Sequence, residues 1–397
     1  MGQQRHLHPA DLLGLGRLAA DATLGLTDLV EALHAAVATL PGMPAQSRTS
    51  GITGLVYGSI RGITRLVGGG LGALHQHSAP LLAAQPATPE REAVLAALNG
   101  VIGDYLAATG NPLAIRMQLR QQGQPLALAP EGLAAIPQPS GRVVLLAHGL
   151  CMNDLHWRWQ GHDHGSQLAA DLGYTPVYLH YNTGLHLSAN GRALAGLIET
   201  LLDNWPTPVQ ELAIVAHSMG GLVCRSACHY AAAAGLRWPT RLRSLVCLGT
   251  PHHGAPLERL GCWVHGALET SPYTAAFARL GTIRSAGITD LRYGSLLDED
   301  RAGGDRFAHS ADRRHPVPLP AGVACYAIAA TTATNPGDLR DQLLGDGLVP
   351  LDSALGHHTN PARALAFSGR WVGRGMGHLD LLHRPDVYAQ IRDWLAR

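Results

Sequence analysis

The chain has 397 residues, of which 46% are hydrophobic and 15% charged, and its formal net charge is +1. This composition supports a large buried core and excludes a globally disordered chain, and the balanced charge gives no reason to expect a nucleic-acid partner. We find no secretory signal at the N-terminus, and no run reaches the roughly 18 apolar residues of a membrane span. The six cysteines show no metal-ligand spacing. Reduced thiols in a cytoplasmic protein are therefore expected.

Residues 1–110 are predicted to form an N-terminal helical extension. Apolar residues recur every three or four positions over 18–37 and again over 52–74, and a third helix is expected over 90–108. Gly58 lies in a series of glycines spaced by four beside the second apolar stripe, a spacing that lets helices approach closely. Two interpretations stay open for these amphipathic helices. They either pack on the protein's own body, or they make peripheral contact with a membrane or a second copy.

Residues 111–397 show the pattern of a second, larger domain. Alternating apolar residues on both sides of Gly123-Gln124 predict a hairpin, and short apolar runs then alternate with helical stretches. This rhythm predicts an α/β fold with a mostly parallel sheet flanked by helices. Residues 255–320 interrupt it and are expected to form a cap or lid. The expected strands are 143–149, 175–181, 211–217, 244–250, 323–330 and 364–371, and the expected helices are 189–204, 219–234 and 385–396.

The stretch AIVAHSMGGL ends a predicted strand and begins a predicted helix at Ser218. Small residues, Ala216 and Gly220, lie two positions before and after this serine, as a sharp strand-to-helix turn requires. Such a turn lifts the hydroxyl above the sheet edge, where the N-terminus of the next helix can stabilise an oxyanion. Ser218 is therefore the candidate nucleophile. The alternative is that Ser218 only caps the helix.

A serine nucleophile needs a base, and the base needs an acid that orients it. In this arrangement the acid and then the histidine follow the serine along the chain. The loop GDGLVP offers Asp346, and the loop GMGHLDLL before the last helix offers His378. Asp338 and Asp352 are the alternative acids.

The strand ending in LLAHGLC supplies a candidate oxyanion hole. The backbone N–H of Leu150, after the His-Gly dipeptide, would join the N–H of Met219. Trp157 and Trp263 are the candidate substrate-binding residues, because the first follows the oxyanion loop and the second lies in an apolar insertion suited to acyl chains. Two alternatives stay open, namely that Trp157 packs beneath the pocket and that the insertion is a rigid cap.

Histidines cluster at 162–164, 252–253 and 357–358. No third and fourth ligand accompanies any of these clusters, so no metal site is expected from them.

Taken together, five motifs resemble those of the lipases and esterases of the α/β-hydrolase superfamily, particularly the bacterial lipases with an AHSMGG elbow. The resemblance also extends to the inositol-deacylase-like hydrolases, and it covers about residues 111–397. The motifs are HGL at 148–150, AHSMGG at 216–221, GTPHHG at 249–254, GDGLVP at 345–350 and GHLDLL at 377–382.

This resemblance implies hydrolysis of carboxylic esters through an acyl-enzyme intermediate, with Ser218, Asp346 and His378 as the catalytic triad. No cofactor is expected. Calcium stays an open possibility, because related lipases carry a calcium-binding aspartate at the position of Asp380, although its first partner ligand has no clear match. Two rival hypotheses are an acyltransferase with the same triad and a non-catalytic, membrane-associated binding protein built on the N-terminal helices.

Overall fold

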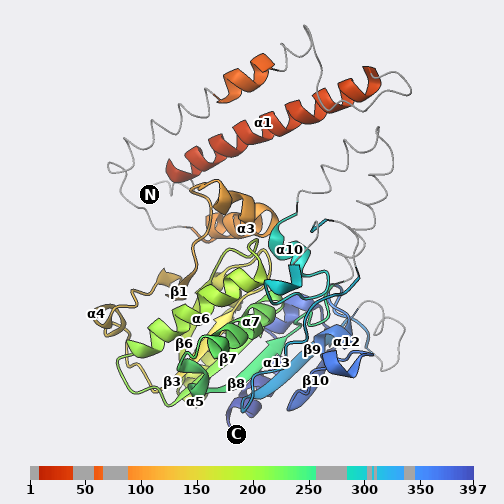
Figure 1. Ribbon diagram of the computed structural model, residues 1–397. Coiled ribbons are helices and arrows are strands. Elements are labelled where there is room, and N and C mark those ends of the chain that lie inside the picture. Colours follow the sequence, from red (N-terminus) through yellow and green to blue (C-terminus); the bar gives the residue numbers. More distant parts are fainter. Residues whose placement is uncertain are drawn as a thin grey trace.

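An eight-stranded sheet forms the centre of the computed structural model (Figure 1). The structure describes residues 9–38, 58–65, 88–255, 284–301, 306–307, 311–334 and 345–397. The strand order is β10-β9-β8-β7-β3-β6-β1-β2, and β3 and β6 to β10 pair in parallel, whereas β1 is antiparallel to β6 and to β2. The strands are β1 Gln118–Gln121, β2 Gln124–Pro125, β3 Arg142–Ala147, β6 Thr175–His180, β7 Glu211–His217, β8 Leu242–Leu248, β9 Ala324–Thr331 and β10 Gly369–Arg374.

Helices cover both faces of the sheet, because the central strands are apolar on both faces. Alternate residues of β3 enter separate cores: Leu145 packs with the face covered by α6 and α7, and Leu146 with the face covered by α5 and α13. This two-sided burial explains the continuous apolar runs of the central strands. It confirms the predicted α/β architecture. The helices are α5 His164–Leu172, α6 Leu187–Asp203, α7 Met219–Ala233 and α13 Pro385–Leu395.

In the N-terminal region, the helix predicted over 18–37 begins nine residues earlier, at Pro9, and the helix predicted over 52–74 is described only over 58–65. Within residues 111–397 the predicted strands and helices are confirmed to within a few residues, with one exception. The last strand was expected at 364–371, but β10 begins only at Gly369. A short 3₁₀ turn, η5 (Pro361–Arg363), precedes it, and Leu365 donates its backbone N–H to Gly356 rather than to a strand. Leu365 and Phe367 are apolar because they enter the core from a loop, so their hydrophobicity misplaced the strand.

The N-terminal helices differ in how they approach this body. In Figure 1, α3 (Pro89–Ala108) lies against the body formed by the sheet and its covering helices, whereas α1 (Pro9–Ala38) and the helix at 58–65 lie beyond α3, away from the sheet. Arg61 Nη1 contacts Glu31 Oε2 of α1 at 2.5 Å and Asp28 Oδ1 at 2.9 Å. A Cβ added at Gly58 would meet no described atom within 4 Å, so the described packing of this helix does not use that glycine.

The segment 255–320 is described only over 255, 284–301, 306–307 and 311–320, and it contains α10 (Ala286–Asp290) and η4 (Glu299–Arg301). None of the helices among the described residues is long and apolar enough to cross a membrane.

Candidate active site

Ser218 occupies the turn between β7 and α7 with φ 54° and ψ −126°. A positive φ is costly for a residue with a side chain, and such strain is typical of functional turns. The backbone N–H of Ser218 bonds to Leu248 O at 2.8 Å, which ties the turn to the end of β8. A Cβ on Gly220 would lie 2.6 Å from the carbonyl oxygens of Ala147 and His148, so only glycine fits there. The turn is a sharp strand-to-helix elbow.

Asp346 and His378 meet at the same edge of the sheet. His378 Nδ1 lies 2.6 Å from Asp346 Oδ2, and the Asp346 side chain is fully buried. The other carboxylate oxygen, Oδ1, accepts the backbone N–H groups of Leu348 at 3.0 Å and Val349 at 2.8 Å. With the carboxylate fixed in this way, His378 carries its proton on Nδ1, which leaves Nε2 as the nitrogen able to accept a proton.

The elbow and the imidazole flank the last residues of β8. A Cβ added at Gly249 would lie 3.0 Å from His378 Cε1, while the residue before it, Leu248, accepts the Ser218 amide. Among the described residues, the Ser218 hydroxyl forms no hydrogen bond with His378. Catalytic hydrogen bonds are often long before substrate binds, so this geometry leaves room for the pair to close.

His217, the residue before the candidate nucleophile, supports the histidine loop. Its Nε2 lies 3.1 Å from the backbone oxygen of His378, and the two rings lie 4.6 Å apart. Burial lowers the pKa of His217 well below its ordinary value, so the ring is neutral and donates from Nε2. The sequence analysis missed this supporting role. The histidine inside the AHSMGG motif was its only signal.

The candidate oxyanion loop runs directly against the elbow. A Cβ on Gly149 would lie 2.9 Å from Ser218 Cβ, which places the Leu150 amide in the immediate neighbourhood of the candidate nucleophile. Met219 is the first residue of α7 and is buried. Tyr181 donates its hydroxyl to His148 O at 2.9 Å and holds the start of the loop.

Helix α3 packs backbone to backbone against this loop, which the sequence analysis did not foresee. A Cβ on Gly100 would lie 3.0 Å from both the N and Cα atoms of Cys151, a residue that itself has φ 59°. Asn182 donates from Nδ2 to Gly103 O at 2.8 Å, and Thr183 accepts the Cys151 amide at 3.2 Å. Gly100 therefore allows α3 to touch the candidate oxyanion loop, and Gly103 allows it to approach Asn182.

Buried charges join α3 to the same region. Arg120 Nη1 lies 2.9 Å from Glu92 Oε2 of α3 and 3.1 Å from Asp154 Oδ1, and His180 Nδ1 lies 3.2 Å from the same Asp154 oxygen. Burial alone would raise the pKa of Asp154, but the hydrogen bond from His180 and the charge of Arg120 lower it below its ordinary value. Asp154 is thus a buried carboxylate that links the end of the oxyanion loop to α3.

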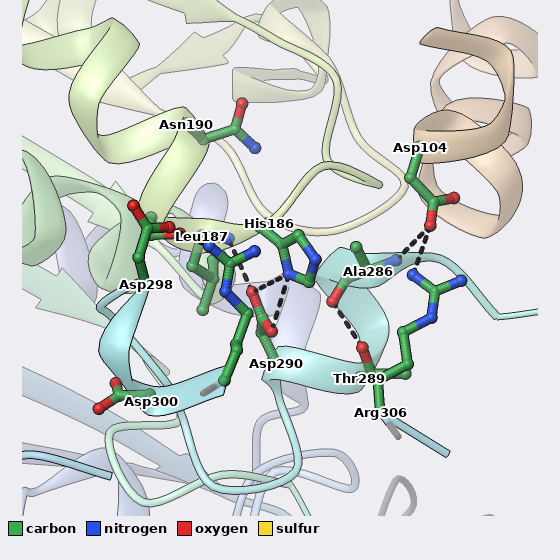
Figure 2. Close-up of polar contacts among 12 residues, drawn as sticks. Asp104, His186, Leu187, Asn190, Ala286, Thr289, Asp290, Asp298, Asp300 and Arg306 are labelled. Carbon is green, nitrogen blue, oxygen red and sulfur yellow. Dashed lines mark hydrogen bonds and ion pairs between the residues drawn. The ribbon is translucent and has the colours of Figure 1, made fainter. Parts of the chain in front are cut away.

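The chain that returns from the insertion is anchored beside these elements. Figure 2 shows Asp290 beside His186, with His186 Nδ1 at 3.1 Å and the Leu187 amide at 2.9 Å from the Asp290 carboxylate. Asp104 of α3 accepts the Ala286 amide at 3.0 Å and pairs with Arg306 at 2.6 Å. Helix α10 is therefore tied to the start of α6 and to α3, and Arg306 is tied to α3 as well.

The remaining predicted residues fall into three groups. Trp157 is fully buried with its ring 6.5 Å from that of His217, a position beneath the elbow. Asp352, one alternative acid, has a side chain 83% exposed and pairs with His357, away from His378. Trp263 and the other alternative acid, Asp338, lie outside the described residues.

Within the described part of the chain, no group of three or more histidine, cysteine or acidic side chains could hold a metal ion. Asp380 accepts the Gly377 amide at 2.8 Å and so caps its own 3₁₀ turn, η6 (His378–Leu382). Its calcium role stays a prediction.

Comparison with known proteins relates part of the chain to a wider group. Residues 138–303 match the family model described as a PGAP1-like alpha/beta domain. No curated protein gives a significant match. The matched segment includes β3 to β8 and Ser218, whereas Asp346 and His378 follow it. Together with the sheet order, this match shows the α/β-hydrolase fold that the motifs implied.

Three solved structures illustrate the similarity. The mature form of Bacillus licheniformis lipase BlEst2 is 18% identical over 66% of this chain and 94% of that chain, with a TM-score of 0.42. Aspergillus fumigatus lipase B is 16% identical over 69% of this chain and 59% of that chain, with a TM-score of 0.41. The Pyrococcus furiosus esterase Pf2001 is 14% identical over 65% of this chain and 82% of that chain, with a TM-score of 0.37.

Proposed function

We propose that this protein, which has the α/β-hydrolase fold, cleaves carboxylic esters with Ser218 as nucleophile, His378 as base and Asp346 as orienting acid. The observation that carries the proposal is the 2.6 Å contact between His378 and the fully buried Asp346, at the sheet edge where Ser218 sits in its strained turn. A buried carboxylate that holds one imidazole nitrogen is what a serine hydrolase needs to keep the other nitrogen available.

The chemistry follows from this arrangement. His378 takes the Ser218 proton as the serine oxygen attacks the ester carbonyl, and the amides of Leu150 and Met219 stabilise the resulting oxyanion. His378 then protonates the leaving alcohol, and the ester bond breaks to give the acyl-enzyme. Water activated by His378 releases the acid and restores Ser218. Asp346 stabilises the imidazolium at both steps without taking its proton.

The proposed substrates are esters with an apolar acyl chain, bound under the insertion at 255–320 with Trp263 in its roof. Trp157 would support the pocket from below, because its ring is fully buried. A panel of p-nitrophenyl esters of increasing acyl length, assayed with and without detergent, measures this preference.

The decisive test replaces Ser218 with alanine. Ser218→Ala should abolish turnover of p-nitrophenyl esters and labelling by a fluorophosphonate probe while the circular dichroism spectrum is unchanged. Ser368→Ala is the matched control, because Ser368 is exposed on the loop before β10. Undiminished turnover in Ser218→Ala rules the proposal out.

The two alternative functions can be distinguished with the same substrates and probe. An acyltransferase would transfer the acyl group to an added alcohol in preference to water, which product analysis detects. A non-catalytic binding protein would fail to react with the fluorophosphonate.

We further propose a cytoplasmic location with peripheral membrane contact through the N-terminal helices. Exposed Leu15, Ile60 and Ile63 on these helices support such contact. Co-sedimentation of the full chain with lipid vesicles, compared with a variant carrying Ile63→Ser, tests it.

A further inference from the structure

A small cavity of about 110 Å³ lies beside the GTPHHG loop. Its wall combines α7, the loop after β8, the segment 314–318 and the residues that precede β10. This wall is rich in groups that donate hydrogen bonds. The lining includes Arg225, His252, Arg314, His315 and Arg363 together with Leu296, Val317 and Leu365.

Arg225 is the most constrained of these groups. Its side chain comes from α7 and the residue is only 4% exposed. Nη1 contacts His252 Nδ1 at 3.2 Å and Nη2 donates to Val317 O at 2.5 Å, while Nε is buried without a hydrogen-bond partner among the described residues. Burial lowers the pKa of Arg225 to about 10, so the guanidinium is still charged at neutral pH.

This guanidinium lacks a counter-charge within the described residues, where no carboxylate forms an ion pair with it. Buried charges are nearly always paired, because an uncompensated charge loses its hydration without recovering it. The ion pairs of the neighbouring arginines do not remedy this, because Asp312 already pairs with both Arg314 and Arg363. Another buried acid in the area, Asp300, accepts the backbone amides of Leu296 and His315.

His252 adds a second unused donor. Because the Arg225 guanidinium can only donate, His252 Nδ1 accepts and the ring proton lies on Nε2. Within the described part of the chain, Nε2 is buried without a hydrogen-bond partner, and the residue is 1% exposed. Burial and the nearby Arg225 charge lower the pKa of His252 well below its ordinary value, so the ring stays neutral. Two buried N–H donors on residues that line the cavity thus have no acceptor among the residues that the structure describes.

We propose that this cavity binds a small oxyanion, a phosphate or carboxylate group, through Arg225 Nε and His252 Nε2. The volume suits it, since a single water molecule needs only about 10–15 Å³ of such space, and the cavity therefore has room for a small oxyanion. An oxyanion would supply both the missing acceptor and the missing negative charge. The site is separate from the candidate nucleophile, because Arg225 lies seven residues beyond Ser218, or about 10 Å along the axis of α7.

The proposal is tested by titrating inorganic phosphate and acetate into the full-length protein at constant ionic strength, with isothermal calorimetry and thermal unfolding as readouts. Arg225→Met should weaken phosphate binding at least tenfold. Arg243→Met should leave it unchanged, because Arg243 is exposed on β8 and absent from the cavity wall. Absence of binding to the wild type, which would mean that water alone fills the cavity, overturns the proposal, as does equal binding by Arg225→Met.

Because Arg225 is buried, its replacement could impair folding. Arg363→Gln at the same wall then provides the second variant and should weaken phosphate binding severalfold. In the wild type, the Nε–H nuclear magnetic resonance signal of a buried arginine should also shift on phosphate addition, and an unshifted set of arginine signals contradicts the proposal. A titration with glycerol 3-phosphate distinguishes a lipid headgroup from a free anion as the source of the bound group. Binding equal to that of inorganic phosphate points to a lipid headgroup, and weaker binding points to a free anion.

The binding readouts do not require ester turnover. Loss of phosphate binding in Arg225→Met with retained esterase activity, or binding by an inactive Ser218→Ala variant, therefore keeps this inference distinct from the proposed function.

Discussion

The two sides of the candidate active site are supported by different parts of the chain. On the histidine side, His378 is held by Asp346 and His217, which both belong to the hydrolase-like body. On the oxyanion side, the loop around Cys151 rests on Gly100 of α3, a helix that precedes the segment matched by the family model. The comparison teaches that α3, a helix outside the sheet and its covering helices, supports one side of the candidate site.

Within the N-terminal region, α3 and α1 differ in how directly they contact the candidate site. Helix α3 meets the body through glycines and the buried Glu92–Arg120–Asp154 network. Helix α1 reaches α3 through the pair of Asp11 with Arg91 at 2.6 Å, one step further from the candidate site. We therefore expect substitutions in α3 to affect activity and substitutions in α1 to leave it unchanged.

The largest expected effect lies on the histidine side. Asp346→Asn should lower kcat by about 10⁴-fold, because the asparagine favours the wrong imidazole tautomer while preserving the shape of the site. Steady-state kinetics with a p-nitrophenyl ester measures the loss. Asp352→Asn is the control and should keep full activity, because Asp352 is exposed and pairs with His357. Similar activity in the two variants would place the acid elsewhere.

On the oxyanion side, Gly100→Val should lower kcat by about 10²-fold, since displacement of catalytic groups by about 1 Å has effects of that size. The valine would collide with the Cys151 backbone. The pH profile of the remaining activity should match the wild type, because the His378–Asp346 pair is untouched. Gly25→Val on α1 is the matched control, because a Cβ there meets no described atom within 4 Å. Equal kcat in both variants would refute the role of α3.

The buried ion network predicts a stability difference. Glu92→Gln should lower the free energy of unfolding by about 3 kcal/mol, because removing one partner leaves buried charges poorly compensated. Urea unfolding followed by circular dichroism measures it. Asp393→Asn removes an acidic partner from an exposed pair with Arg392 and should leave the midpoint unchanged. A shift in Glu92→Gln no larger than in this control would show that the network contributes little.

The smallest expected effect, about 2 kcal/mol for each histidine between pH 7.5 and pH 5, is shared by both sides. Burial lowers the pKa of His148 on the oxyanion side, and of His164 beneath the histidine side, to about 3. Above pH 6.5 these histidines are neutral in both the folded and the unfolded protein. Between pH 6.5 and pH 3 only the unfolded protein binds the additional proton. Each histidine therefore lowers the free energy of unfolding by up to about 1.4 kcal/mol for every pH unit by which the pH falls.

Urea unfolding at pH 7.5 and pH 5 measures this decline. His164→Asn should reduce the pH dependence by the contribution of one histidine, and a pH dependence as steep as in the wild type would show that His164 is protonated in the folded protein.

Local patterns predicted much of this structure. Apolar runs located the central strands because both faces of a parallel sheet are buried, and small residues around Ser218 predicted the elbow because no larger side chain fits the turn. The contact of Gly100 with Cys151 could not be predicted, because it joins segments far apart in the chain without a local pattern. Leu365 and Phe367 misled the strand prediction, since hydrophobicity reports burial and does not distinguish a loop from a strand.

The sheet order has a consequence for the growing polypeptide. Strands β7, β8, β9 and β10 occupy successive positions toward one edge of the sheet in the order in which a ribosome makes them. A nascent chain can thus seat the Ser218 elbow while the loops carrying Asp346 and His378 are still unmade. Domains that fold during synthesis pass through such incomplete states. Under the proposed function, this state holds the candidate nucleophile without its candidate base, so ester hydrolysis should begin only after β10 has joined the sheet.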